Sequence, residues 1–321
     1  MKRTTAIMAG ILTAAGLAVM AAAFVLSGFD FSKFGTEKYD TRTFPVKESF
    51  RNIEISTEDS DVIFAESSDG SVSIVCTETD KVKHEISVDN GILKITSEDR
   101  RNWTDHFMSF RTQPVSVTVF LPPAEYGALI IDSNTGDVTV PGFPVFETLR
   151  IKTDTGDVSC DASVSGPAGI ITDTGDIRVN EIRTEQLDLS VSTGTIFAED
   201  IACKNALSVS VGTGKTNLKD VSCGSFTSTG DTGEITLENV IAKETMSVSR
   251  DTGDVRFQAC DAAELTVRTS TGDVEGTLCS EKVFLIETST GDTDVPKTTA
   301  GGKCEITTST GDIRIRISDA G

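Results

Sequence analysis

The stretch LRIKTDTGDVSC, residues Leu149–Cys160, decides the fold. Its central Thr-Gly pair occurs ten times along the chain, at intervals of 19 or 20 residues. The ten glycines are Gly136, Gly156, Gly175, Gly194, Gly214, Gly233, Gly253, Gly272, Gly291 and Gly311. A fixed period of this length is typical of a protein built from stacked structural repeats.

Apolar and polar residues alternate on both sides of each glycine. In the quoted stretch, Leu149 and Ile151 precede the glycine, and Val158 and Cys160 follow it. Alternation with a period of two predicts a strand with one buried face, and the change of phase at the glycine predicts a corner. A single repeat cannot bury its own apolar row, whereas stacked coils bury it between neighbours.

These patterns predict an all-β fold, a parallel β-solenoid of about ten coils of 19–20 residues over residues 124–321. The alternative is a β-sandwich built from hairpins. Its strands would have no reason to place the same residue pair at the same corner ten times.

A degenerate copy of the repeat, called the worn coil below, precedes the ten regular ones and has Ser60 in the place of the corner glycine. Further strands are expected over residues 72–75, 86–88, 92–95 and 115–121. Asn90-Gly91 is expected to form a hairpin turn. Residues 45–123 are therefore predicted to form an irregular β cap that hides the first open edge of the solenoid, and residues 29–44 a short stalk.

The charge of the chain bears on its partners. Its 321 residues carry 49 acidic and 29 basic side chains, a formal net charge of −20. A negative field of this size repels phosphates, which argues against a nucleic-acid partner. The two histidines, His84 and His106, are too few for a histidine-rich metal site.

The N-terminus has the features of an export segment. Lys2 and Arg3 precede an apolar run over residues 6–26, about the length that crosses a bilayer. The positive residues before this run place the N-terminus inside and the rest of the chain outside the cell. Two readings stay open for residues 1–28: a signal anchor that is kept in the membrane, or a signal peptide that is cleaved near Ala21-Ala22-Ala23 and leaves a secreted protein.

Taken together, the N-terminal segment, the motif Phe50-x-x-Ile53-x-Ile55, the irregular β region and the Thr-Gly-Asp-[Val/Ile] coils resemble the bacterial putative-adhesin family, a domain of unknown function. The resemblance covers roughly residues 45–321. It implies an exported or membrane-anchored β-solenoid. Because the family has no agreed catalytic residues, the resemblance implies no catalytic site.

The residue after the corner glycine suggests a cation site. Two uninterrupted runs of aspartate follow the glycines: Asp137, Asp157 and Asp176, and then Asp254, Asp273 and Asp292. In stacked coils these carboxylates lie about 5 Å apart and repel one another. Calcium bound to them is one hypothesis, and no other cofactor is expected. Ordinary turn chemistry, with hydrogen bonds to backbone N–H groups, is the other, and Arg178, Arg256 and Arg314 are placed to pair with the aspartates.

The seven cysteines also leave two interpretations. Cys203 and Cys223 occupy equivalent positions of adjacent coils, as do Cys260 and Cys279, so each pair is near the separation that a disulfide requires. The odd count and the apolar position of Cys160 favour unpaired thiols in the core instead.

The segment over residues 98–114 breaks the periodicity. It contains Trp103, His106, Phe107 and Phe110, which would suit either a binding tip or a plug for the end of the solenoid. The chain is accordingly expected to be a non-enzymatic, surface-displayed β-solenoid that binds a glycan or protein or serves envelope structure. An exported sensor of envelope stress and a polysaccharide-active β-helix enzyme are the alternatives.

Overall fold

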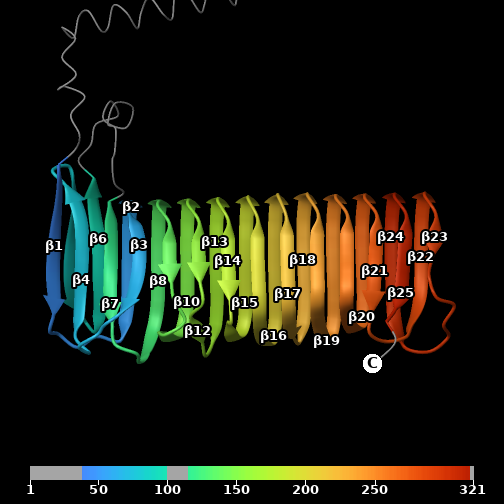
Figure 1. Ribbon diagram of the computed structural model, residues 1–321, viewed down its shortest axis with the longest axis horizontal. Helices are drawn as coiled ribbons and strands as arrows, with labels where there is room; N and C mark the ends of the chain where they lie inside the picture. The colour runs from blue at the N-terminus through green and yellow to red at the C-terminus, as the bar shows by residue number, and fades with distance from the viewer. Residues whose placement is uncertain (1–37, 100–114, 319–321) are drawn as a thin grey trace, which may run out of the picture.

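The computed structural model describes residues 38–99 and 115–318. These residues form one elongated stack of β-strands, called the rack below (Figure 1). Hydrogen bonds join 25 strands into one continuous system. Helices are absent from these residues, which confirms the all-β prediction. The same residues contain no helix that is long and apolar enough to span a membrane. The predicted export segment, residues 1–28, lies outside the described residues.

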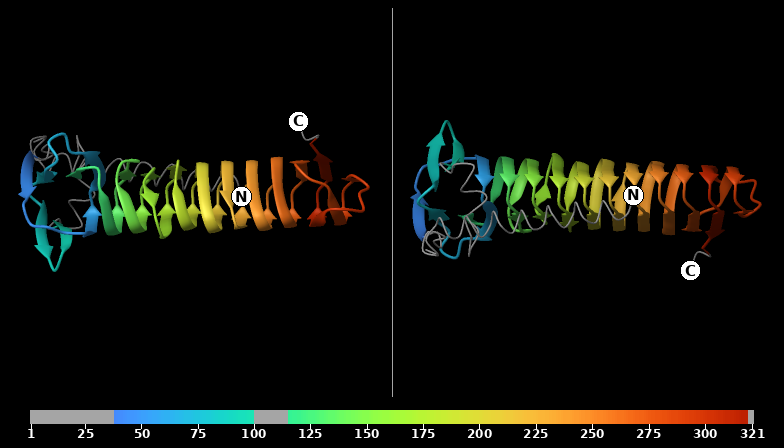
Figure 2. Two further views of the ribbon diagram at one scale, coloured as in Figure 1. Left: turned by 90° about the horizontal axis from the view of Figure 1, so that it is seen from below. Right: turned by 90° about the horizontal axis from the view of Figure 1, so that it is seen from above.

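The rack has two facing walls, which Figure 2 shows on opposite sides of its narrow dimension. The first wall contains the strands that precede the corner glycines: β8 (Glu125–Thr135), β10 (Val145–Thr155), β13 (Pro167–Thr174), β15 (Arg183–Thr193), β18 (Ser225–Thr232), β22 (Lys282–Thr290) and β24 (Gly302–Thr310). The second contains those that follow them: β9 (Val138–Val140), β11 (Val158–Cys160), β14 (Ile177–Asn180), β17 (Thr216–Cys223), β21 (Val274–Leu278), β23 (Thr293–Asp294) and β25 (Ile313–Ile317). The short β12 (Ser163–Val164) pairs with β10. Three longer strands run through the bend between walls: β16 (Ile196–Thr213), β19 (Ile235–Thr252) and β20 (Val255–Thr271).

Neighbouring coils pair in parallel and in register with the repeat. Ile151 of β10 pairs with Ile131 and Ile170. Val158 of β11 lies between Val138 and Ile177 in the same way. The apolar rows recognised in the sequence therefore stack on themselves, and the predicted parallel β-solenoid is confirmed.

The corner glycine is required by the backbone. At Gly233, φ is +132°, and a Cβ would lie 1.7 Å from the carbonyl oxygen of Gly214 on the adjacent coil. Any side chain at this position would therefore meet the backbone of its neighbour, besides adopting a backbone conformation that is essentially confined to glycine.

A buried arginine interrupts the apolar interior of the regular coils. Arg250 is 3% exposed, and its Nη2 donates to Ser228 Oγ at 2.9 Å and to Thr216 Oγ1 at 3.1 Å. A Cβ on Gly230 would lie 2.5 Å from the Arg250 guanidinium. Four residues that depart from the repeat pattern therefore form one structural feature: Arg250, Ser228, Thr216 and Gly230. The two hydroxyls accept hydrogen bonds from the guanidinium, and the glycine leaves the space that the guanidinium occupies.

The cap extends both walls beyond the worn coil. Its strands are β1 (Tyr39–Val46), β2 (Asn52–Asp59), β3 (Asp61–Glu66), β4 (Val72–Thr79), β5 (Val82–Asp89), β6 (Ile92–Asp99) and β7 (Ser116–Leu121). The first wall continues from β8 through β2, β6 and β5, and the second from β9 through β3, β7, β4 and β1. The predicted hairpin turn is present, with positive φ at Asn90 (49°) and Gly91 (76°). Ser60 lies next to Gly136, as the worn copy predicts.

One boundary and the order of the last coils differ from the sequence prediction. Strand β1 begins at Tyr39, inside the segment expected to be a stalk, and pairs antiparallel with β4 along its full length. Its side chains are mostly exposed, so it has no apolar alternation that would have marked it in the sequence. The order of the last coils also differs, because β24 pairs with both β20 and β22 and therefore lies between them (Figure 1). The last coil in sequence is not the last in space.

Candidate functional site

The corner glycines and the residues beside them line up along one long edge of the rack, the corner edge. On this edge an aspartate with a further coil beside it accepts a hydrogen bond from the backbone of that coil. The backbone N–H of Asp157 donates to Asp137 Oδ1 at 2.8 Å, and the N–H of Asp176 donates to Asp157 Oδ1 at 2.8 Å. The series starts in the worn coil, where Asp61 Oδ1 accepts from the Asp137 N–H at 3.0 Å. One carboxylate oxygen of each of these aspartates therefore serves as a backbone acceptor.

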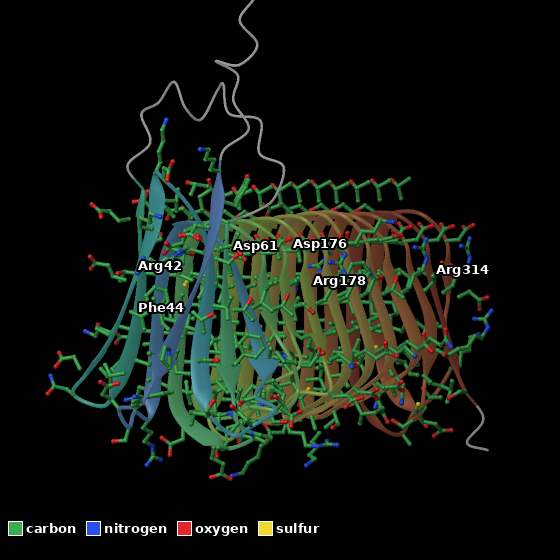
Figure 3. The ribbon with its side chains drawn as sticks, turned by 60° about the vertical axis from the view of Figure 1, so that its left-hand side comes forward. Arg42, Phe44, Asp61, Asp176, Arg178 and Arg314 are labelled. Carbon is green, nitrogen blue, oxygen red and sulfur yellow. The ribbon has the colours of Figure 1, made fainter. Side chains whose placement is uncertain are left out.

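Arginines engage the other carboxylate oxygens. Arg178 lies 2.8 Å from Asp176 Oδ2 and 3.5 Å from Asp157 Oδ2, and Figure 3 shows it beside Asp176 on the corner edge. Arg256 pairs with Asp254 at 2.8 Å, and Arg314 pairs with Asp312 farther along the rack. These contacts offset the repulsion between stacked carboxylates, as the sequence predicted.

Charged residues between the two aspartate runs also form ion pairs. Lys215 Nζ lies 2.6 Å from Glu234 Oε1, and Arg256 Nη1 lies 2.7 Å from Glu234 Oε2. These hydrogen bonds lower the pKa of Glu234. The middle of the corner edge is therefore a chain of alternating charges.

The second aspartate run needs a correction. Because the last coil is inserted, the order in space is Asp254, Asp273, Asp312 and then Asp292. In the described residues, none of the six proposed calcium ligands joins a group of three or more metal-binding atoms. The calcium hypothesis stays a prediction, without a shared coordination centre to support it. The proposed binding tip, Trp103, His106, Phe107 and Phe110, lies outside the described residues.

A hollow that the sequence analysis missed opens on the second wall near the far end. It has a volume of about 450 Å³ and is lined by Arg256, Phe257, Gly276, Arg314 and Arg316, among others. Gly276 replaces an apolar residue of the repeat and has a positive φ of 136°. The glycine was a visible signal, but the arginines come together only because β25 is inserted beside β21.

The thiols have a simple arrangement. All seven cysteines are unpaired, and only Cys279 is not fully buried. Burial raises the pKa of Cys160 to about 12 and that of Cys223 to about 11. Buried protonated thiols of this kind act as small apolar side chains rather than nucleophiles.

Comparison with known proteins adds a family and a set of similar folds. The family model described as Toastrack DUF4097 matches residues 50–206 and again residues 198–321. A putative lipid binding protein from Parabacteroides distasonis is 18% identical, with 75% of this chain and 94% of that chain covered and a TM-score of 0.46. A putative adhesin from Parabacteroides merdae is 13% identical, covering 86% and 96% of the two chains with a TM-score of 0.47. A putative adhesin from Bacteroides fragilis is 13% identical, covering 88% and 98% with a TM-score of 0.41.

These structural similarities are too low to carry a ligand or partner from one protein to another. A search of curated proteins finds no match to the chain.

Proposed function

The chain belongs to the Toastrack DUF4097 family, and from that premise we propose that it is a non-enzymatic rack, displayed outside the cell, that binds a glycan or a protein. The apolar run over residues 6–26, preceded by Lys2 and Arg3, would anchor it in the cell membrane with the rack outside. Loss of this segment by cleavage would release the same rack as a secreted binder.

The observation that carries the proposal is a row of ten exposed threonines, each directly before a corner glycine. The threonine row consists of Thr135, Thr155, Thr174, Thr193, Thr213, Thr232, Thr252, Thr271, Thr310 and Thr290, in spatial order. Strand pairing spaces the hydroxyls about 4.8 Å apart on a rigid support. A regular row of this kind suits an extended ligand whose own groups repeat, because each unit meets the same hydroxyl.

The state of the charged groups supports a binding role over catalysis. General acid–base chemistry needs a carboxylate with a perturbed pKa in a cleft, within reach of a substrate. On the corner edge, Asp157 and Asp176 already accept backbone hydrogen bonds and pair with Arg178. Their task in the fold is structural.

The proposal is tested with the full-length chain on intact cells. Added protease should remove the rack, and the cells should bind members of a glycan array or a panel of extracellular matrix proteins. The triple variant Thr193→Ala, Thr213→Ala, Thr232→Ala should lose this binding. The matched control Thr227→Ala, Ser249→Ala removes exposed hydroxyls away from the row and should keep it.

Protection of the rack from protease on intact cells would contradict the display outside the cell. An accessible rack that binds nothing in either panel, or a triple variant that binds as well as the control, would contradict the binding role of the threonine row.

A further inference from the structure

A buried polar cluster lies where the cap meets the worn coil. In β4, the inward-facing row places Cys76 and Glu78 in succession, and both side chains are 0% exposed. His84 of β5 is 4% exposed and completes the cluster. One ligand atom from each of the three residues lies within 4.8 Å of the others, and no other such group occurs in residues 38–99 and 115–318.

The histidine ring has one satisfied nitrogen and one unsatisfied nitrogen. Nε2 lies 3.0 Å from Ser60 Oγ, the side chain that replaces the corner glycine in the worn coil. Nδ1 lies 3.4 Å from Glu78 Oε1 and makes no hydrogen bond within the described part of the chain. In the tautomer that carries its proton on Nε2, this nitrogen donates to Ser60 Oγ, and the Nδ1 lone pair is then buried beside a carboxylate.

Two lone pairs that meet in the interior are unfavourable unless a proton or a cation lies between them. Glu78 Oε1 accepts a hydrogen bond from the His84 backbone N–H at 2.7 Å. Lys83 Nζ and Arg42 Nη1 each lie 3.4 Å from the other carboxylate oxygen, Oε2.

We propose that Cys76 Sγ, Glu78 Oε1 and His84 Nδ1 bind a zinc ion. The mixture of sulfur, nitrogen and oxygen donors suits zinc, whereas calcium and magnesium need several oxygens. The thiolate and the carboxylate balance the two charges of the ion, so the occupied cluster is neutral. In the tautomer with its proton on Nε2, the hydrogen bond to Ser60 Oγ fixes the ring orientation that a metal-bound histidine requires.

The geometry needs only a small adjustment. In a tetrahedral zinc site the ligand atoms lie roughly 3.5 Å apart, and Nδ1 and Oε1 are already 3.4 Å apart. Because all three ligand atoms lie within 4.8 Å of one another, Cys76 Sγ has to move by no more than about 1.3 Å to reach this spacing, which a side-chain rotation supplies. Binding displaces the thiol proton, which leaves to solvent.

The ion would fasten the β4–β5 turn to the corner at Ser60, and so hold the cap against the first regular coil. Metal binding of this kind adds directly to folding stability. The site is independent of the ligand proposed for the threonine row.

The test uses the full-length chain without an added histidine tag. After chelation and dialysis against zinc, the wild type should retain one zinc per chain and melt at a higher temperature than the metal-free form. Cobalt in place of zinc should give a thiolate-to-cobalt absorption band. Cys76→Ser should lose the band and the thermal shift, whereas Cys223→Ser, which changes another buried thiol, should keep both.

X-ray absorption of the zinc-loaded wild type gives a measurement that does not depend on a variant folding. It should show one sulfur ligand. Absence of bound zinc, a coordination shell without sulfur, or a folded Cys76→Ser variant that binds as tightly as the wild type would overturn the proposal.

Discussion

The backbone N–H of Asp312 donates to Asp273 Oδ1 at 2.8 Å, although a complete coil with its own corner aspartate, Asp292, separates the two in sequence. Asp292 in turn donates its N–H to Asp312 Oδ1 at 2.7 Å. The chain therefore runs to the end of the rack, turns back, and inserts its last coil between the two before it (Figure 1).

The composition of the two coils explains this order. The inserted coil carries Ile313 and Ile315 on its inward face, and both are 0% exposed. The other coil carries Thr293 at the position equivalent to Ile313, and there Thr293 is exposed. Placing the more apolar coil inside buries more apolar surface, and the more polar coil then serves at the end of the stack, where one of its faces stays in water.

This order predicts which cysteine pair can be cross-linked. In a Cys279→Ser background, Thr271→Cys with Thr310→Cys should form a disulfide under mild oxidation, because these residues are neighbours in register. Neighbouring strands lie about 4.8 Å apart, within the range that a disulfide spans. Thr271→Cys with Thr290→Cys should not react, since Thr310 lies between them. Electrophoresis without reductant distinguishes the two, and the reverse result would restore sequential stacking.

The sequence alone was sufficient for most of the fold and insufficient for this detail. Two-residue alternation around Gly156 determines both strands and the corner, because each depends only on local pattern. The position of the last coil depends on a choice between Thr290 and Thr310 as the partner of Thr271, and both present the same residue in the same register. The partner of Thr271 is decided by how much apolar surface each of the two last coils buries, and that comparison requires the stacked structure.

The candidate sites show the same division. Aspartates in register along the corner edge could be predicted from the repeat. The approach of His84 to Cys76 and Glu78 could not, because the turn between β4 and β5 brings them together in a region without a repeat. The alternating Cys76-x-Glu78 was the available signal, since a charged residue in a buried row requires partners.

Gly233→Val should destabilise the rack far more than Lys215→Ala, although both positions lie on the corner edge. The valine Cβ would meet the Gly214 carbonyl at a backbone conformation reserved for glycine, at a cost of about 2 kcal/mol or more. Lys215 loses only an exposed ion pair with Glu234, worth less than about 1 kcal/mol. Chemical denaturation measures both, and equal stabilities would show that the corner is assigned wrongly.

Asp273→Ala should cost about 1 kcal/mol, because it leaves the Asp312 N–H without its acceptor. Asp273→Asn keeps an acceptor oxygen and should cost less. The same proteins test calcium: turn chemistry predicts that calcium and sodium at equal ionic strength raise the melting temperature equally. A larger rise with calcium that is lost in Asp273→Asn would instead support the calcium hypothesis.

Acid should weaken the far end of the corner edge through Asp312. The hydrogen bond from the Asp292 N–H and, beside it, the Arg314 guanidinium lower the pKa of Asp312 in the folded chain. The unfolded chain therefore binds this proton more readily. The stabilisation is complete above about pH 4 and is lost as the pH falls through the lower folded-state pKa. Denaturation between pH 5 and pH 2 should show a shallower decline for Asp312→Asn than for the wild type, and identical slopes would exclude this contribution.

A thiol reagent should modify one cysteine in the native protein and seven in denaturant, with chelator present in both measurements. Cys279 is the one thiol that is not fully buried. The other six are buried, and burial raises the pKa of each to between about 11 and about 12, so neither access nor thiolate is available. Cys279→Ser should abolish native labelling and leave six thiols in denaturant.

Fewer than seven thiols in the unreduced, denatured wild type would reveal a disulfide, with Cys203–Cys223 and Cys260–Cys279 the pairs to examine by peptide mapping. More than one native thiol would mean that the walls open on the timescale of labelling, which a continuous hydrogen-bonded rack should prevent.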